Sequence, residues 1–298
     1  MLTQRRLAIG LLLFVPLAIC ASCATAPAAD TSKLIRGLAA DHRVDFIRVY
    51  YHSEVVGKDQ AFALYVPPTY NAEKATPVVV FLHSYWTNYD DKQYYRVTEL
   101  PGTIQEQCDR RGWIAVEPEG DGNSWYVGKA EEQVLETVQQ LKAFLNVDDT
   151  RLYLIGRSMG GAGALTIAMH HPDKVAGVVS LAGISDYAAL VKSSPYLLNN
   201  EPGSVRSEFG GTPEDKPAAY HEMSAVNHVD VLKKMPVYLI HGGADDIVPV
   251  TQSQTLAKLL QDGGGQISYK EVPGEKHNME MIERFAADYF KFLDEHSR

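Results

Sequence analysis

The sequence of 298 residues contains only three cysteines, and Cys20 and Cys23 both lie near its beginning. The third is Cys108. After cleavage of the leading segment, Cys108 is the only cysteine in the folded part, so we expect no internal disulfide there. We therefore expect the folded part to depend on its hydrophobic core, which a chain of about 270 residues is long enough to build.

Basic residues are also few. The sequence has 28 Lys and Arg against 37 Asp and Glu, a net charge of −9. This balance argues against a nucleic-acid-binding protein, because the phosphate backbone selects a basic surface. The histidines lack the H-E-x-x-H spacing of a metal site, and the glycine run at 160–163 lacks the Lys-Ser/Thr ending of a phosphate-binding loop. The sequence predicts no metal and no cofactor.

Long apolar runs are missing as well. The run from Leu7 to Ile19 is too short for a comfortable transmembrane helix. Arg5 and Arg6 precede it and small residues follow, which is the layout of a secretory signal. We expect residues 1–23 to be a signal peptide and the Ala-rich residues 24–40 to be a tether. The protein is then exported, as a periplasmic protein, a membrane-anchored lipoprotein or an extracellular protein.

The stretch "LAICASCATA" resembles a bacterial lipobox, in which a cysteine becomes the lipidated first residue of the mature chain. Cys23 follows Ala21 and Ser22 and fits the small-residue requirement, whereas Cys20 follows the bulky Ile19. The resemblance implies a lipid anchor through Cys23. Ordinary signal cleavage is the alternative.

Strand-like and helix-like segments alternate along the rest of the chain. The first two strand-like segments read as an antiparallel hairpin, and the apolar run "PVVVFLH" is typical of a strand buried on both faces. The alternation predicts an α/β domain over 41–298, with a mostly parallel sheet covered by helices on both faces. The expected strands are 46–53, 60–67, 77–83, 112–119, 151–156, 175–183, 236–243 and 266–274, and the expected helices are 129–146, 161–171, 252–264 and 278–296.

One stretch, residues 186–232, interrupts this alternation. It contains four prolines and the pair Gly210-Gly211 between two expected strands. A connection of this length is typical of an active-site lid or a binding insertion. Its polar, Pro- and Gly-rich composition differs from the apolar flap of a lipase, and so favours small or soluble substrates over dispersed lipids.

The stretch "LIGRSMGGAG" places four glycines around Ser158. A buried strand, then G-x-S-x-G, then a helix is the arrangement of a nucleophile elbow, in which a strained turn lifts the serine hydroxyl above the sheet. Gly156 and Gly160 are explained by the close quarters of that turn, and Gly161 and Gly163 by helix-to-sheet packing. The pattern predicts Ser158 as a nucleophile.

A serine nucleophile needs a base and an acid that orients the base, and in this arrangement they follow in the order Ser, Asp or Glu, His. Asp245 and Asp246 come directly after an expected strand, and we favour Asp245, which stands four residues after His241. His277 lies between the last strand and the last helix. We predict Asp245 as the acid and His277 as the base, and a structural role for His241.

With these residues in place, the chain from about 45 to 295 resembles the α/β-hydrolase superfamily. The stretches "LYLIGRSMGGAGAL" and "FGGTPEDKPAAYHEMSAVNHVDVLKKMPVYLIHGGADDIVP" are similar to those of secreted esterases and prolyl-oligopeptidase-like hydrolases. Feruloyl esterases, acetylxylan esterases and polyhydroxyalkanoate depolymerases belong to this neighbourhood. The resemblance implies a Ser158–His277–Asp245 triad.

Two backbone N–H groups are expected to form the oxyanion hole. One belongs to Met159, the residue after the nucleophile, and the other comes from the loop after the strand 77–83. Many relatives have His-Gly at that point, where this chain has His83-Ser84. A serine restricts the backbone more than a glycine does, which leaves the identity of the second donor open. Tyr85 is our first choice and Trp86 the next.

Aromatic residues are frequent in the loops expected at this edge of the sheet. Trp86, Trp125 and Tyr126 are the predicted substrate-binding residues. The alternative is that such aromatics only pack the loops.

Three functions fit the sequence. The first is a carboxylic ester hydrolase acting on feruloyl, acetyl or other short acyl esters, small or attached to polysaccharide. The second is a serine peptidase of prolyl-oligopeptidase type, although the length leaves no room for the large gating domain usual in such enzymes. The third is a non-catalytic binding protein on a hydrolase fold, which normally lacks a triad residue.

Overall fold

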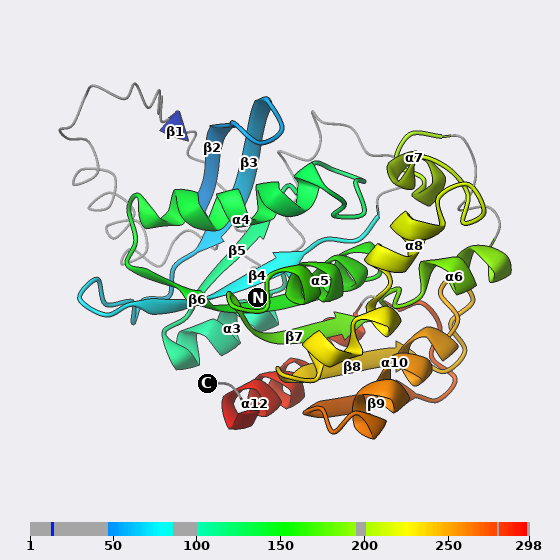
Figure 1. Cartoon of the computed structure of the whole chain (residues 1–298). Coiled ribbons are helices and arrows are strands. Elements are labelled where there is room, and N and C mark those ends of the chain that lie inside the picture. Colours follow the sequence, from blue (N-terminus) through cyan, green and yellow to red (C-terminus); the bar gives the residue numbers. More distant parts are fainter. Residues whose placement is uncertain (1–12, 15–46, 86–99, 195–200, 279, 297–298) are drawn as a thin grey trace, which may run out of the picture.

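The computed structural model of the chain describes residues 13–14, 47–85, 100–194, 201–278 and 280–296. Apart from the two-residue strand β1 (Leu13–Phe14), the predicted signal segment, including Cys23, and the tether lie outside these residues, as does Trp86. A nine-stranded sheet runs through the described part in the order β1-β2-β3-β5-β4-β6-β7-β8-β9 (Figure 1).

The predicted hairpin is confirmed at one side of this sheet. β2 (Ile47–Ser53) pairs antiparallel with β3 (Lys58–Tyr65), and Gly57 takes a positive φ of 70° in the connecting turn. β3 pairs antiparallel with β5, and every pair from β5 to β9 is parallel. These parallel strands are β4 (Thr76–Leu82), β5 (Ile114–Pro118), β6 (Val147–Arg157), β7 (Val175–Leu181), β8 (Val237–Gly242) and β9 (Ile267–Val272).

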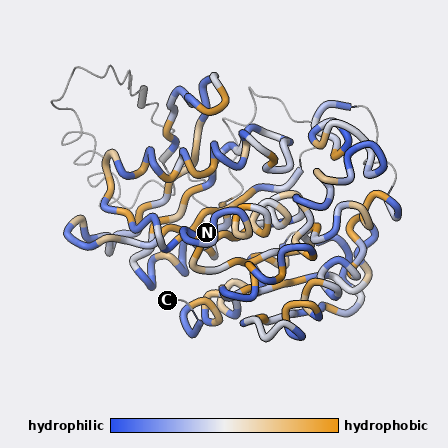
Figure 2. The backbone as a smooth tube through the Cα atoms, in the orientation of Figure 1, coloured by the Kyte–Doolittle hydropathy of each residue, from blue (hydrophilic) through white to orange (hydrophobic). Residues whose placement is uncertain are grey.

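The central strands are buried because helices cover both faces of the sheet. Every residue of β4, β5, β7 and β8 is buried, and the hydropathy of the chain is highest along these strands (Figure 2). Alternate residues of β4 enter two separate cores, Val78 and Val80 on one face and Val79 and Phe81 on the other. This confirms the predicted α/β architecture.

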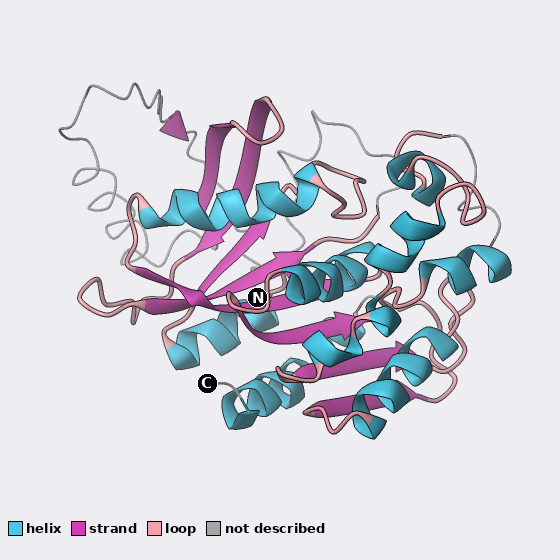
Figure 3. Cartoon of the chain, viewed as in Figure 1, coloured by secondary structure: helices cyan, strands magenta, loops and turns pink. Residues whose placement is uncertain are grey.

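The helices divide between these two cores (Figure 3). Apolar residues of α4 (Lys129–Lys142), α5 (Met159–His170) and α10 (Thr251–Asp262) enter the first core. Those of α3 (Gly102–Arg111), α11 (Met281–Arg284) and α12 (Ala286–His296) enter the second.

The structure corrects the predicted elements at two places. Helix α3 had no sequence prediction, because Ile104, Gln107 and Cys108 are the only residues it buries and they make a weak apolar pattern. The single helix predicted over 278–296 is divided into α11 and α12 at Phe285, whose φ of −107° and ψ of 14° leave the helical region.

The described parts of the insertion, residues 186–194 and 201–232, are built largely from short helices. Its core is aromatic: the Phe209 ring lies 4.8 Å from both the Tyr187 and the Tyr220 ring. None of the helices in the described ranges is long and apolar enough to span a membrane. The insertion contains α6 (Tyr187–Ser193), α7 (Val205–Phe209), α8 (Pro217–Met223), the 3-10 turn η2 (Ala225–Asn227) and α9 (Val229–Leu232).

Candidate active site

Ser158 occupies a sharp turn between β6, which ends at Arg157, and α5, which begins at Met159. Its φ of 51° and ψ of −116° lie in a region that residues with a side chain rarely adopt. Its N–H donates to the carbonyl oxygen of Leu181 at 2.8 Å, which ties the turn to the end of β7. The structure therefore holds this serine in a strained conformation at the N-terminus of a helix, as the elbow pattern predicts.

The glycines around Ser158 are explained by close contacts. A Cβ on Gly156 would lie 2.2 Å from the carbonyl oxygen of Gly160, and a Cβ on Gly160 would lie 2.0 Å from that of Leu82. Both distances are far below a van der Waals contact, so the turn admits only glycine at these two positions. The interpretation of Gly156 and Gly160 is confirmed.

The next two glycines serve packing. A Cβ on Gly161 would lie 2.9 Å from Ser180 Oγ at the end of β7, in line with the predicted helix-to-sheet packing. A Cβ on Gly163 would instead meet the Tyr126 ring at 2.4 Å, so its neighbour is a loop residue rather than the sheet.

The structure brings Ser158, His277 and Asp245 together from three loops at the same edge of the sheet. His277 Nε2 lies 3.1 Å from Ser158 Oγ, and His277 Nδ1 lies 2.7 Å from Asp245 Oδ2. Asp246 is exposed and faces Lys276 Nζ at 3.1 Å. Of the two adjacent aspartates, Asp245 is therefore the one beside the histidine.

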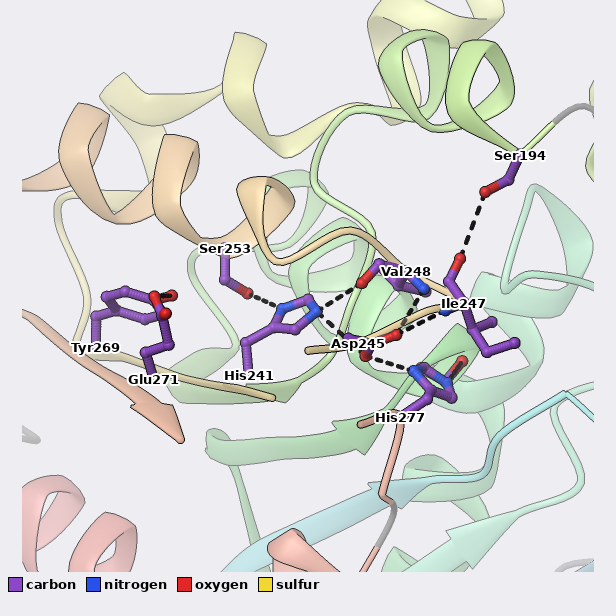
Figure 4. A network of polar contacts seen from close by, with 10 residues as sticks. Ser194, His241, Asp245, Ile247, Val248, Ser253, Tyr269, Glu271 and His277 are labelled. Atoms are coloured by element: carbon purple, nitrogen blue, oxygen red, sulfur yellow. Dashed lines mark hydrogen bonds and ion pairs between the residues drawn. The ribbon is translucent and has the colours of Figure 1, made fainter. Parts of the chain in front are cut away.

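The Asp245 carboxylate is enclosed (Figure 4). Its side chain has no solvent exposure, and Oδ1 accepts hydrogen bonds from the N–H groups of Ile247 at 2.9 Å and Val248 at 2.8 Å. Burial alone would raise its pKa, but hydrogen bonds from His241, His277 and the Val248 N–H outweigh burial and hold the pKa far below its ordinary value. The carboxylate is thus ionised and fixed in orientation.

His241 supports this carboxylate from the other side. Its Nε2 lies 2.9 Å from the Val248 carbonyl oxygen and 3.3 Å from Asp245 Oδ2, and its Nδ1 lies 2.7 Å from Ser253 Oγ. The side chain is fully buried. A structural role for His241 agrees with this placement. Ser253 was missed in the sequence, because a polar residue in the first turn of an expected helix carries no signal of its own.

The two predicted oxyanion donors come from the ends of two neighbouring strands, β4 and β6. Met159 begins α5, whose N-terminal N–H groups carry partial positive charge, and Tyr85 follows β4. Ser84 Oγ, next to Tyr85, donates to the Arg157 carbonyl oxygen at 3.4 Å. The serine that replaces the usual glycine thus ties the Tyr85 loop to the residue before Ser158. Donation to an oxyanion by Met159 and Tyr85 stays a prediction.

The predicted substrate-binding aromatics differ in burial. Trp125 is only 3% exposed, and its Nε1 donates to the Gly203 carbonyl oxygen at 2.8 Å, which links it to the insertion. Tyr126 is fully buried, and its hydroxyl donates to the His83 carbonyl oxygen at 3.4 Å. A substrate contact has no support for Tyr126, whose side chain reaches no surface, and stays a prediction for Trp125. Within the described part of the chain, no cluster of His, Cys, Asp and Glu is arranged to hold a metal ion.

Solved structures share this fold. A thermostable esterase superposes with a TM-score of 0.64 at 23% identity, over 88% of this chain and 64% of that one. An S-formylglutathione hydrolase from Agrobacterium tumefaciens superposes with a TM-score of 0.62 at 19% identity, over 85% of this chain and 96% of that one. These similarities establish the α/β-hydrolase fold.

The fold and the family together define a serine hydrolase of the α/β-hydrolase type. The model of the prolyl oligopeptidase family matches residues 122–298, and the chain belongs to that family. The matched part contains Ser158, Asp245 and His277.

Curated relatives carry both esterase and peptidase names. The esterase YjfP of Escherichia coli is 32% identical over 44% of this chain, and the uncharacterized peptidase YtmA of Bacillus subtilis is 28% identical over 48%. An uncharacterized secreted protein of Arthroderma benhamiae is 34% identical over 42% of this chain. The alignments span 51%, 53% and 12% of these three relatives, respectively.

Proposed function

We propose that the protein hydrolyses carboxylic esters through an acyl-enzyme formed on Ser158. The observation that carries the proposal is the unbroken chain of contacts from Ser158 Oγ through the His277 ring to the buried Asp245 carboxylate. A serine, a histidine and an enclosed carboxylate in this geometry are the parts that acyl transfer requires.

In the first step the Ser158 hydroxyl attacks the ester carbonyl carbon. His277 Nε2 takes the hydroxyl proton and then gives it to the departing alcohol, while Asp245 holds the ring through Nδ1 and stabilises its cationic form. The strained backbone of Ser158 keeps Oγ at the N-terminal end of α5. The oxyanion then forms beside N–H groups whose dipoles favour negative charge.

In this proposal the N–H groups of Met159 and Tyr85 bind the oxyanion. Water afterwards attacks the acyl-enzyme, with His277 taking the proton of the water and returning it to Ser158 as the acid leaves. The chemistry uses side chains and backbone groups throughout and needs no cofactor.

The proposed substrates are feruloyl, acetyl or other short acyl esters, either small molecules or groups attached to polysaccharide. An esterase name among the curated relatives and an esterase among the similar folds support ester hydrolysis. The polar insertion supports soluble substrates over dispersed lipids. Because all three residues of the proposed triad are present, a purely non-catalytic binding role is the weakest of the three functions.

Hydrolysis of peptides is the second candidate function. The family itself and the Bacillus subtilis relative named as a peptidase favour it. An amide differs from an ester in its leaving group, because the departing nitrogen must be protonated by His277 as the bond breaks.

We also propose that the protein is exported, with a signal segment within residues 1–23 that is cleaved before Cys23, and with Cys23 as the site of a lipid anchor. The relative described as secreted supports export. Mass determination of the membrane fraction from an expressing bacterium tests the anchor, and the expected result is a diacylglyceryl mass on Cys23 that Cys23→Ala removes.

The function is tested by a side-by-side panel of aryl esters, methyl ferulate, acetylated xylan and a prolyl amide, with Ser158→Ala as the control. We expect turnover of esters that the variant loses. Turnover confined to the prolyl amide would replace the esterase with the peptidase, and equal turnover by the variant would refute both.

A further inference from the structure

Two large apolar side chains stay open to solvent beside the candidate active site. In the described ranges, the exposed large apolar residues are Tyr85, Ile247 and Leu259. Leu259 lies on α10, away from Ser158 in the chain and outside the loops at the carboxyl edge of the sheet. Tyr85 and Ile247 lie in two of those loops, after β4 and β8.

The sheet order places these two side chains on opposite sides of the nucleophile. β4 is the neighbour of β6 on one side, and β7 and then β8 follow on the other. All four strands are parallel, so the loops after them meet at one edge. Ser158, at the end of β6, therefore lies between the Tyr85 loop and the Ile247 loop.

The backbone of Ile247 is held from two directions. Its N–H donates to Asp245 Oδ1 at 2.9 Å, and its carbonyl oxygen accepts from Ser194 Oγ at 3.4 Å at the end of α6. Figure 4 shows the side chain on the His277 side of this loop. Ile247 is 44% exposed, and its backbone is fixed beside the Asp245 carboxylate.

Tyr85 lies beside another part of the insertion, around Gly203. Its ring lies 6.0 Å from the Trp125 ring, and a Cβ on Gly203 would lie 3.8 Å from the Tyr85 ring edge. The Trp125–Gly203 hydrogen bond fixes this corner. The insertion therefore contacts both loops: Ser194 bonds to the backbone of Ile247, and Gly203 bonds to Trp125, whose ring neighbours the Tyr85 ring.

An apolar surface exposed to water costs free energy, and the binding of an apolar group to it recovers that free energy. Such a surface, held in place beside a reaction centre, is therefore suited to binding an apolar part of a substrate. On the basis of the proposed ester hydrolysis, we propose that Tyr85 and Ile247 are the two apolar walls of the substrate-binding site. They receive an aryl or alkyl group of the ester larger than acetyl, on its acyl or its alcohol side. The preferred substrates are thus esters with such a group rather than simple acetates.

The test measures kcat/KM for Ile247→Ala and Tyr85→Ala, with Leu259→Ala as a control at an exposed apolar residue away from the site. One arm uses nitrophenyl esters of acetic, butanoic and hexanoic acid, and the other uses acetates of methanol, butanol and phenol. The preference is the ratio of kcat/KM for the largest ester of an arm to kcat/KM for the smallest. The apolar group lies on one side of the ester, so we expect this ratio to fall about five- to tenfold in both wall variants in the arm that varies that side, because each variant loses apolar contact with the group. The Leu259 variant keeps the wild-type preference.

The proposal is overturned if either wall variant keeps a preference within twofold of wild type in both arms. The circular dichroism spectrum of the variant must be unchanged, which shows that it is folded. Ile247→Leu, which keeps the apolar volume, is expected to restore the preference, and failure to do so counts against the wall as well. Ser158→Ala distinguishes a failure of the proposed walls from a failure of the proposed function. Full activity in that variant refutes ester hydrolysis by this site itself.

Discussion

A histidine–carboxylate pair lies at each end of helix α5, and the two pairs differ in what surrounds them. At the N-terminal end, His277 Nδ1 lies 2.7 Å from Asp245 and its Nε2 lies 3.1 Å from Ser158. At the C-terminal end, His170 Nδ1 lies 2.9 Å from Glu131, and its Nε2 lies 3.6 Å from Glu222 on α8. The second nitrogen thus meets a hydroxyl at one end and a carboxylate at the other.

This difference shows that a histidine–carboxylate pair does not by itself indicate catalysis. Two carboxylates around His170 favour its charged form, and the Glu131 hydrogen bond raises the pKa of His170. A positive charge there also suits the negative end of the helix dipole. His277 instead has one carboxylate on Nδ1 and the Ser158 hydroxyl on Nε2, at the positive end of the same helix.

The largest expected effect comes from removing the hydroxyl that distinguishes the two ends. Ser158→Ala is expected to lower kcat for the best ester by at least about 10³-fold, the size of effect found when a triad residue is lost. Initial rates in enzyme excess measure it. His170→Gln is the matched change at the other end and is expected to keep kcat within about twofold.

The next largest effect on kcat is expected from removing the charge of Asp245, the proposed acid. Asp245→Asn is expected to lower kcat by about 10²- to 10³-fold, because the amide no longer stabilises the cationic His277 ring. Asp246→Asn is the control on the adjacent, exposed aspartate and is expected to change kcat by less than twofold. Equal losses in the two variants would contradict the assignment of the acid.

At the other end of α5 the expected effect is on stability. His170→Gln is expected to lower the free energy of unfolding by about 1 kcal/mol near pH 6, from the loss of a partly buried ion pair at a helix C-terminus. Denaturant titration measures it. His52→Gln, which removes the exposed pair with Asp59, is the control and is expected to have no measurable effect.

The smallest expected effect is the pH dependence of the difference in unfolding free energy between wild type and His170→Gln. The folded pKa of His170 is raised, so its contribution is complete below the unfolded pKa of about 6.5 and is lost as the pH rises through the folded value. The stability difference between wild type and His170→Gln should therefore shrink between pH 6 and pH 9. A difference that grows over this range would contradict the charged His170.

The sequence predicts the two ends of α5 unequally. Ser158, Asp245 and His277 were found because the elbow pattern and the chain order restrict the search to few positions, and the structure places them in contact. The Glu131–His170–Glu222 contacts join α4, α5 and the insertion, and no short pattern connects residues 39 and 52 positions apart.

The fold was predicted where burial leaves a clear pattern. The strands β4 to β8 read as apolar runs because both faces are covered, whereas α3 buries three residues and was missed. Tyr126 was expected near the substrate from its loop position alone. Its burial depends on Gly163 leaving room for the ring, a contact between distant segments that composition does not reveal.

The central claim is that Ser158 is the nucleophile of an ester hydrolase, and covalent labelling tests it most directly. The protein is treated with a nitrophenyl phosphonate ester, which a serine nucleophile attacks with loss of nitrophenolate, and the labelled peptide is identified by mass spectrometry. The account predicts one phosphonyl group per chain on Ser158, no label in Ser158→Ala, and slower labelling in Asp245→Asn. Stoichiometric labelling at another residue, or an unlabelled Ser158 in a protein that still hydrolyses esters, would contradict it.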